Sequence, residues 1–237
     1  MFPRSKSGKR IFIALLLVGA LLGGGLGVGF SYFYDFPELD YLKNYRPNTI
    51  TRIYSHDKQV LAELYQERRI PRSLSEIPPI LRQALLSIED SRFYNHPGVS
   101  YPDIIRAFVR NLRAGRRVQG GSTITQQLAK ILFLTPERTY NRKIREALLA
   151  LEIERRFTKD EILEFYLNQI YLGSGAYGVE AAAKIYFDKN VGQLTLAEAA
   201  TIAGLPKAPF RFNPQINREN ALKRRKLVLQ RMRALGF

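Results

Sequence analysis

The chain opens with a long apolar run that no charged residue interrupts. Residues 11–30 (IFIALLLVGALLGGGLGVGF) are twenty uncharged, mostly apolar residues, and a helix of that length spans roughly 30 Å, the thickness of the hydrocarbon core of a bilayer. Basic residues precede the run and aromatic residues follow it: Arg4, Lys6, Lys9 and Arg10 on one side, and Tyr32, Phe33, Tyr34 and Phe36 on the other. The pattern predicts a transmembrane anchor over 11–30, a basic cytoplasmic tail over 1–10 and an extracytoplasmic remainder.

A cleaved signal peptide is the alternative interpretation of the same segment. The run is longer than the apolar core of a typical signal, and no clear small-x-small cleavage site accompanies it. We therefore favour an uncleaved anchor, followed by a juxtamembrane linker over 31–48.

Beyond the linker, the spacing of hydrophobic residues is first typical of strands and then of helices. Hydrophobic and polar residues alternate along 49–70, as they do in strands, on both sides of the turn signal SHDK (55–58). This pattern predicts a small hairpin. From Pro78 onward the period is helical, and the first helix places four apolar residues on one face: Leu81, Ala84, Leu85 and Ile88. The fold class predicted for 49–237 is a mostly α domain with one short β-hairpin at its membrane-proximal start.

Caps and glycines delimit these helices. The first helix should end before His96-Pro97-Gly98, and Ser100 should cap the next, which runs to about Gly115. Three later helices are expected from Thr123 through Phe133, from Thr135-Pro136 to about Phe157, and from Thr158 to near Tyr171. A turn at Gly173, Gly175 and Gly178 should lead into a helix over 181–186, and a short helix should follow from Thr195 to Gly204. A Pro/Asn loop at 205–217 then precedes the last helix, close to the C-terminus.

The charge balance is strongly basic. Against 21 Asp and Glu stand 37 Lys and Arg, a net charge of +16, which indicates a polyanionic partner, although a solvated basic surface has the same composition. An extracytoplasmic domain seldom meets nucleic acid, so we expect no nucleic-acid partner and assign the charge to lipid headgroups or a phosphorylated lipid. The absence of cysteine excludes disulfides, thiol nucleophiles and Cys-ligated zinc, and two histidines are too few for a histidine-rich metal site.

Three polar clusters could carry chemistry. Glu89 lies one turn after Leu85 beside the apolar face, and a carboxylate partly withdrawn from water has a raised pKa that suits a general base; a surface acid near a helix end is the plainer alternative. The segment QGGSTITQQLAK (119–130) brings glycines, hydroxyls and amides to a helix N-terminus, which favours an anion over an ordinary cap. The third cluster is Arg138 with NRKIRE (141–146), where Arg142 and Glu146 share a helix face; a surface salt bridge is the plainer alternative. Residues 101–145 hold ten Lys or Arg and two acids, a density suited to clamping a diphosphate.

Residues 101–115 also form a basic amphipathic helix. One stripe is apolar: Ile104, Ile105, Phe108, Val109 and Leu112. Arg106, Arg110 and Arg113 lie outside this stripe. Such a helix near an anchor is typical of membrane-surface binding, and core packing of the same stripe is an equally good explanation.

Six segments in order resemble one known family. They are EDSRFYNHPG (89–98), RAFVRNLRAG (106–115), QGGSTITQQLAK (119–130), RKIRE (142–146), KDEILEFYLNQIYLG (159–173) and GAYGVEAAAKIYF (175–187). Together they resemble the glycosyltransferase domain of class A penicillin-binding proteins, the peptidoglycan glycosyltransferases of family 51, over residues from about 45 to 237. The resemblance implies a lysozyme-like helical fold with a small membrane-dipping lobe, and a chain that many relatives continue into a transpeptidase domain.

The resemblance also implies the reaction and its residues. Lipid II and the growing glycan strand would be the substrates, joined by a β-1,4 bond with inversion and release of undecaprenyl diphosphate. Glu89 would deprotonate the acceptor hydroxyl, and Glu146 would be the second carboxylate, near the donor diphosphate and a divalent cation (Mg²⁺ or Mn²⁺) if one binds; no organic cofactor is expected. The substrate-binding residues carried over are Asp90, His96, Arg106, Ser122, Gln127, Lys130, Arg138, Arg142 and Lys143.

The expected setting is the cytoplasmic membrane of a bacterium, with the catalytic domain on the periplasmic face. The bilayer and other cell-wall synthesis proteins are the expected partners. Two other functions remain open: a lysozyme-like enzyme that cleaves glycan, which shares a helix-borne glutamate, and a non-catalytic membrane-anchored scaffold. Cleavage needs no diphosphate clamp, so the basic segment favours synthesis.

Overall fold

The computed structural model describes Gly19, Gly23 and residues 51–57, 59–64, 68–115, 120–135, 137 and 139–237. Four predicted parts lie outside the described residues: the tail (1–10), the anchor (11–30) apart from Gly19 and Gly23, the linker (31–48) and the site residue Arg138. Among the residues that are described, no helix has the length and apolar character needed to cross a bilayer. The chain divides into two compact units, Met1–Tyr41 and Leu42–Phe237, and the second contains the elements below.

The hairpin predicted at the start of the second unit is present. Strand β1 (Thr51–Tyr54) pairs antiparallel with β2 (Val60–Leu64), with a register shift at Ile53/Tyr54. The turn between them begins at Ser55, whose backbone N–H donates to the carbonyl of Gln59 (2.8 Å). The strand-like alternation around SHDK is therefore confirmed as a hairpin.

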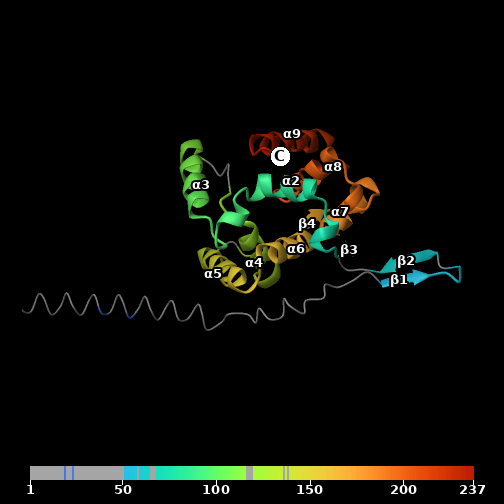
Figure 1. The fold of residues 1–237 in the computed structure, drawn as a ribbon, viewed down its shortest axis with the longest axis horizontal. Coiled ribbons are helices and arrows are strands. Elements are labelled where there is room, and N and C mark those ends of the chain that lie inside the picture. The colour runs from blue at the N-terminus through green and yellow to red at the C-terminus, as the bar shows by residue number, and fades with distance from the viewer. Residues whose placement is uncertain are drawn as a thin grey trace, which may run out of the picture. The chain divides into compact units, whose positions relative to one another are not determined.

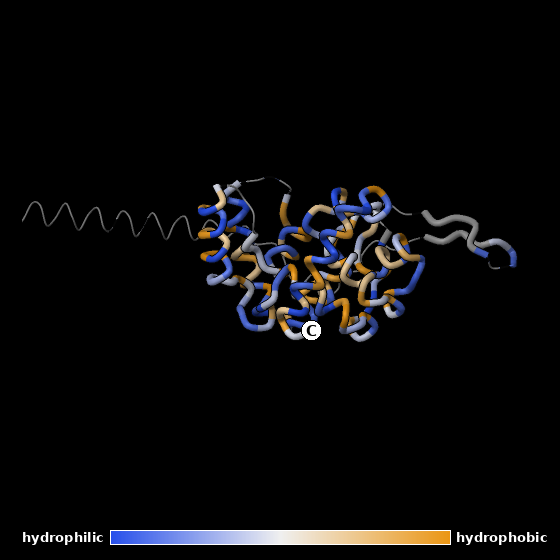
Figure 2. Tube along the Cα trace, turned by 90° about the horizontal axis from the view of Figure 1, so that it is seen from above, coloured by the Kyte–Doolittle hydropathy of each residue, from blue (hydrophilic) through white to orange (hydrophobic). Residues whose placement is uncertain are grey.

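The rest of the described chain is mostly helical, as the period predicts (Figure 1). The α-helices are α2 (Pro79–Glu89), α3 (Tyr101–Ala114), α4 (Ile124–Phe133), α5 (Tyr140–Arg156), α6 (Lys159–Gln169), α7 (Val179–Phe187), α8 (Leu196–Gly204) and α9 (Arg218–Ala234), with short 3-10 turns at Leu74–Glu76, Phe93–Asn95 and Val191–Gln193. Along the chain, hydrophobic and hydrophilic positions alternate within single helices (Figure 2), as expected where each helix buries one face.

Local capping chemistry sets most helix starts. Thr123, Thr158 and Thr195 each form the predicted capping box at the start of α4, α6 and α8. The start of α5 was predicted wrongly at Thr135-Pro136: the helix begins at Tyr140, because the Thr139 hydroxyl accepts from the backbone N–H of Arg142 (3.1 Å).

Ser100 occupies the N-cap position of α3, but it makes no capping bond. Its hydroxyl donates to the carboxylate of Asp103 instead. The predicted cap is therefore right in position and wrong in chemistry: the hydroxyl donates to Asp103 and accepts no backbone N–H of the helix.

A second small sheet was not predicted. Strands β3 (Arg68–Arg69), β5 (Ala176–Tyr177) and β4 (Tyr171–Gly173) pair in that order, β3 with β5 in parallel and β4 with β5 antiparallel. The glycine turn ends at Gly178 (φ +83°), where an added Cβ would lie 2.7 Å from the carbonyl oxygen of Asn168. Only glycine accepts both that φ and that close approach, so the turn can pass directly into α7.

Two helix groups form the core. Helices α2, α8 and α9 pack together, and α4 packs on α5 and α6. Helix α3 stands to one side of them (Figure 1), and its buried Ala107 faces Gly121, where an added Cβ would lie 3.3 Å from the Ala107 Cβ and 3.1 Å from the Ile104 Cα. The bare glycine backbone therefore lets α3 approach the segment that leads into α4.

Candidate active site

A cleft of about 960 Å³ opens where α2 ends and α4 begins. Its walls come from α3 on one side and from the α8–α9 loop and α9 on the other. Its ionisable lining consists of the acids Glu89, Asp90 and Asp103 and the cations Arg106, Arg110, Arg113, Lys130, Lys207, Arg224 and Arg231. Seven cations against three acids give this cleft a positive potential, which favours a polyanionic ligand.

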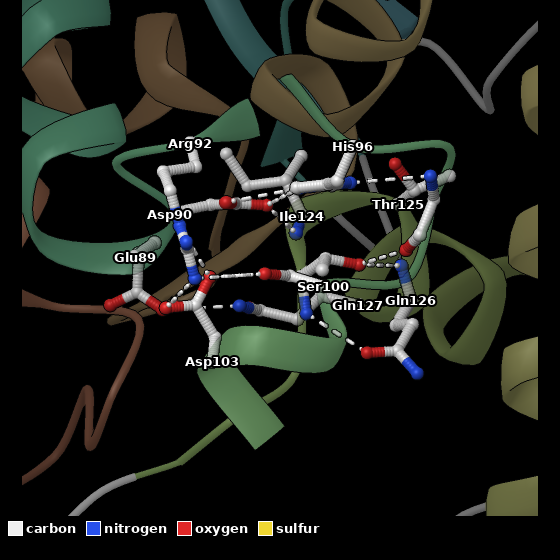
Figure 3. A network of polar contacts seen from close by, with 12 residues as sticks. Glu89, Asp90, Arg92, His96, Ser100, Asp103, Ile124, Thr125, Gln126 and Gln127 are labelled. Atoms are coloured by element: carbon white, nitrogen blue, oxygen red, sulfur yellow. Dashed lines mark hydrogen bonds and ion pairs between the residues drawn. The ribbon is translucent and has the colours of Figure 1, made fainter. Parts of the chain in front are cut away.

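Glu89 is the last residue of α2 and lies in this cleft with its side chain 13% exposed. Its Oε2 accepts a hydrogen bond from Nε2 of Gln127 (3.1 Å), and its Oε1 lies 3.6 Å from Nη2 of Arg224 (Figure 3 shows the pair with Gln127). Burial raises the pKa of Glu89, while the Gln127 bond and the charges of Arg224 and Lys207 oppose that rise. A carboxylate that is ionised but readily protonated is what a general base requires.

Arg224 is held in place by groups other than the glutamate. Its side chain is 7% exposed, its Nε donates to the carbonyl of Gly204 (3.2 Å), and its guanidinium lies 5.5 Å from the ring centre of Phe212. Burial lowers the pKa of Arg224 and the nearby Glu89 raises it again. A guanidinium stays charged in proteins, so Arg224 is a fixed positive charge beside the carboxylate.

Asp90 joins the end of α2 to the start of α4. One of its oxygens accepts from the backbone N–H of Ile124 (3.0 Å), and both lie within 3.1 Å of Nε2 of His96 (Figure 3). The backbone N–H of Gly98 donates to Nδ1 of the same ring (3.2 Å), so Nε2 must carry the proton that faces Asp90. The predicted anion at the N-terminus of α4 is thus the protein's own carboxylate.

Asp103 organises the first turn of α3. Nη2 of Arg92 lies 2.7 Å from its carboxylate, and Arg106 and the Ser100 hydroxyl also bond to it. Hydrogen bonds from Ser100 and Arg92 and the charge of Arg106 lower the pKa of Asp103 against the opposing effect of burial. The network fixes α3 to the loop that follows Glu89 and aims Arg106 at the cleft.

Glu146 lies behind the cleft and not on its surface. It is buried, and its oxygens bond to Nη1 of Arg142 (2.8 Å) and to Nζ of Lys143. Lys143 in turn donates to the hydroxyl of Ser122 (2.7 Å), a lining residue. Glu146 therefore reaches the cleft through the Lys143 ammonium and the Ser122 hydroxyl.

This arrangement does not fit a divalent cation at Glu146. Each of its two oxygens already bonds to a cationic side chain, and no group of three or more Asp, Glu or His residues with metal-binding geometry occurs in the described part of the chain. The cation stays a prediction that this donor set does not favour, because Mg²⁺ and Mn²⁺ require several oxygen ligands.

Helix α3 presents two different faces. Three of its arginines line the cleft: Arg106, Arg110 and Arg113. The predicted apolar stripe is exposed, with Phe108 at 66%. Core packing was therefore the wrong alternative for this stripe, because only Ala107 of this helix is buried.

The structure gathers most of the predicted site. Glu89, Asp90, Arg106, Ser122, Gln127 and Lys130 line one cleft. His96 acts behind Asp90, and Arg142, Lys143 and Glu146 form the adjoining group. Glu89 and Asp90 thus line the cleft directly, whereas Glu146 reaches it only through Lys143 and Ser122.

Three cations on the other wall were missed: Lys207, Arg224 and Arg231. Arg224 could have been found from its spacing, because it shares a helix face with Ala221, Val228 and Met232, which are all buried. A charged residue at a core position of a helix indicates a special partner. Lys207 carries no comparable local pattern within the Pro/Asn loop.

Comparison with known proteins agrees with this geometry. The family model described as Transglycosylase matches residues 57–233. The chain belongs to the transglycosylase family. That span contains the cleft described above, with both of its walls and the Glu146 group.

Relatives of this transglycosylase chain are similar along nearly its whole length. Penicillin-binding protein 1A of Escherichia coli (strain K12) is 49% identical over 230 residues, 96% of this chain and 27% of the relative. The protein of the same name from Aquifex aeolicus (strain VF5) is 48% identical over 230 residues, 97% of this chain and 32% of the relative. The chain thus spans about a third or less of the length of these relatives. A solved penicillin-binding protein 1A from Haemophilus influenzae aligns with 79% of this chain and 18% of its own at 29% identity, with a TM-score of 0.43.

Proposed function

We propose that this transglycosylase domain is a peptidoglycan glycosyltransferase that polymerises lipid II into β-1,4 glycan strands. The observation that carries the proposal is a mostly buried carboxylate, Glu89, in a cleft lined by seven cationic side chains. A general base alone would suit many hydrolases, and a basic groove alone would suit many binding proteins. The combination suits the transfer of a sugar from a diphosphate carrier.

In the proposed step the 4-hydroxyl of the acceptor sugar attacks the anomeric carbon of the donor chain. The new C–O bond forms as the bond from that carbon to the diphosphate oxygen breaks, so the carbon inverts. The hydroxyl proton passes to Glu89, and undecaprenyl diphosphate leaves with the bonding electron pair. Oε1 is the oxygen suited to take the proton, because Oε2 already accepts from Gln127.

The cations replace a general acid in this mechanism. A diphosphate leaves as an anion and needs charge stabilisation more than a proton. We assign the donor diphosphate to the wall that holds Arg106, Ser122 and Lys130, supported from behind by Lys143 and Glu146. By the same resemblance Arg138 belongs to this wall, although it lies outside the described residues.

Helix α3 is the proposed point of contact with the bilayer. Its exposed apolar stripe would enter the interface while its arginines face the cleft. A lipid-linked diphosphate lies at that depth in a membrane, so both faces of the helix would meet one substrate. The proposal includes a lysozyme-like fold with a membrane-proximal lobe, an anchor over 11–30 in the bacterial cytoplasmic membrane, a periplasmic catalytic domain and other cell-wall synthesis proteins as partners.

The deciding experiment compares wild type with Glu89→Gln on lipid II, with the products separated on a gel. Loss of the base should slow chain growth by about 10²–10⁴-fold with folding retained. Glu219→Gln is the matched control, because Glu219 is 81% exposed and pairs only locally with Lys223 (2.6 Å) in the described chain; it should polymerise at the wild-type rate.

The same gel distinguishes the competing functions. Shortening of preformed glycan strands by the wild type, without chain growth, would assign the cleft to cleavage. Full polymerisation by Glu89→Gln would overturn Glu89 as the base. A non-catalytic scaffold predicts no product from either protein.

A further inference from the structure

A tyrosine that does not line the cleft reaches the base through one amide. Tyr166 lies on α6 with its side chain fully buried. Its hydroxyl donates to Oε1 of Gln127 (3.2 Å), and Nε2 of the same amide donates to Oε2 of Glu89 (3.1 Å). Three side chains from α6, α4 and α2 thus form one hydrogen-bonded chain that ends at the carboxylate.

The direction of this chain follows from the ionised glutamate. A carboxylate only accepts, so the amide must turn its NH₂ group toward Glu89 and its oxygen toward Tyr166. The tyrosine hydroxyl must then donate to that oxygen. Successive hydrogen bonds in one direction polarise and strengthen one another.

The reversed amide would place Oε1 of Gln127 against the carboxylate, acceptor against acceptor. It would suit a protonated Glu89, which could donate to that oxygen, with the tyrosine accepting from the NH₂ group. With the amide reversed, the tyrosine O–H proton would have no acceptor among the described contacts, so the hydroxyl disfavours the protonated glutamate. Burial, with added effects of Glu89 and Asp90, raises the pKa of Tyr166 well above its usual value, so the hydroxyl keeps its proton at every working pH.

We propose that Tyr166 is a positioning residue for the general base. Its hydroxyl orients the Gln127 amide so that Glu89 stays ionised, with Oε1 directed at the hydroxyl of the acceptor sugar. The inference rests on the proposed function and deepens it. Phenylalanine would fill the same core volume, so packing alone does not account for the hydroxyl, and the described contacts give this hydroxyl no other partner than Gln127.

Tyr166→Phe in the full chain tests the proposal through a pH–rate profile on lipid II. The variant should be slower than wild type by about twofold at alkaline pH and about tenfold on the acid limb, the fold-changes expected for one lost hydrogen bond. The limb should move to higher pH, because without the hydroxyl the Gln127 amide can turn its oxygen toward a protonated Glu89, and a hydrogen bond from the neutral form raises the pKa of Glu89. KM should stay within about twofold, because Tyr166 touches no substrate.

Tyr186→Phe is the matched control. It removes a partly buried hydroxyl that donates to the Leu172 carbonyl (2.9 Å), outside the cleft lining, and its acid limb should match that of wild type. A Tyr166→Phe limb that also matches wild type would leave Tyr166 as ordinary core and overturn the proposal.

A double-mutant cycle with Gln127→Met gives a second, independent readout. Gln127→Met should itself move the acid limb, and adding Tyr166→Phe should change the rate by less than about twofold, because the hydroxyl acts only through the amide. Multiplicative losses in the double variant would overturn the proposal. Failure of the proposed function looks different: the wild type would make no polymer, or Glu89→Gln would remain active.

Discussion

Replacing Asp90 by asparagine should leave two hydrogen-bond donors facing each other inside the protein. The asparagine oxygen in the position of Oδ2 can still accept from the backbone N–H of Ile124 and from Nε2 of His96, but the NH₂ group then takes the position of Oδ1, where it lies 3.1 Å from the same Nε2 donor and has no acceptor there. Moving the ring proton of His96 to Nδ1 does not remove the conflict, because the backbone N–H of Gly98 already donates to Nδ1. One buried donor therefore loses its partner whichever tautomer forms.

The size of the effect follows from these contacts. A hydrogen bond to a charged group contributes about 1.5–3 kcal/mol, and an unsatisfied buried donor costs about 1–3 kcal/mol. Burying one carboxylate fewer offsets part of that loss. We expect Asp90→Asn to lower the free energy of unfolding by about 2–4 kcal/mol, which lowers Tm by roughly 4–16 °C for a domain of this size.

Thermal unfolding of the full chain in detergent, followed by circular dichroism, measures the change. Asp160→Asn is the control, because Asp160 accepts an exposed hydrogen bond from the Tyr94 hydroxyl (2.9 Å); it should shift stability by less than about 0.5 kcal/mol. An Asp90→Asn protein as stable as this control would refute the reasoning. So would nitrogen NMR of the wild type that found the His96 proton on Nδ1.

Three further expectations follow from the site and the fold. Because burial raises the pKa of Glu89, the polymerisation rate should begin to fall at a pH above about 4.3, where an exposed glutamate loses its charge; a pH–rate profile that stays flat to that value would contradict this. The chain has no tryptophan, so Phe108→Trp would place a single tryptophan on α3, and its emission should shift to the blue in liposomes. Phe210→Trp is the control, because Phe210 lies in a loop and is 76% exposed; its emission should not shift. Equal behaviour of the two variants would count against α3 as the membrane contact. Gly98→Ala should lower the free energy of unfolding, measured in urea, by about 1–3 kcal/mol or more. The φ of this residue is +90°, and the new Cβ would lie 2.7 Å from the Ala150 carbonyl oxygen. Unchanged stability would mean that this turn relaxes freely.

Helix starts were predictable because their chemistry is local. A threonine and an acid or amide three residues later satisfy each other whatever the rest of the fold does, so Thr123, Thr158 and Thr195 could be placed from sequence. Thr135-Pro136 lacks such a partner and is favoured because proline suits the first position of a helix, but Thr139 supplies the actual cap of α5. Two nearby candidates compete for one helix start, and the sequence does not rank them.

The second sheet could not be predicted in the same way. Strands β3 and β5 contain two residues each, too few to show an alternating pattern. Their pairing joins Arg68 to Ala176, and such a distant contact depends on how α6 and α7 pack. Tertiary packing, and not local preference, decides whether these residues become strands.

The candidate site likewise has one part that the local sequence predicts and another that depends on tertiary packing. The position of Glu89 at the end of a helix, beside an apolar face, could be read from its spacing to Leu85, and the roles of the neighbouring motifs came from their resemblance to a family. Arg224 comes from the last helix, and nothing near it in sequence points to Glu89. Its role appears only when α9 packs on α2 and brings the guanidinium to 3.6 Å from the carboxylate.

The adjacency of Glu89 and Asp90 has a mechanical consequence. The first is the proposed base and the second accepts from the first backbone N–H of α4, so the proposed base and the segment beside Ser122 cannot move apart without breaking a buried hydrogen bond. Arg92 ties Asp103 of α3 to the loop after Glu89, and Arg224 of α9 lies against Glu89 itself, so both walls are joined to the same end of α2. The proposed base and the cations around it are therefore preset relative to one another before any substrate arrives.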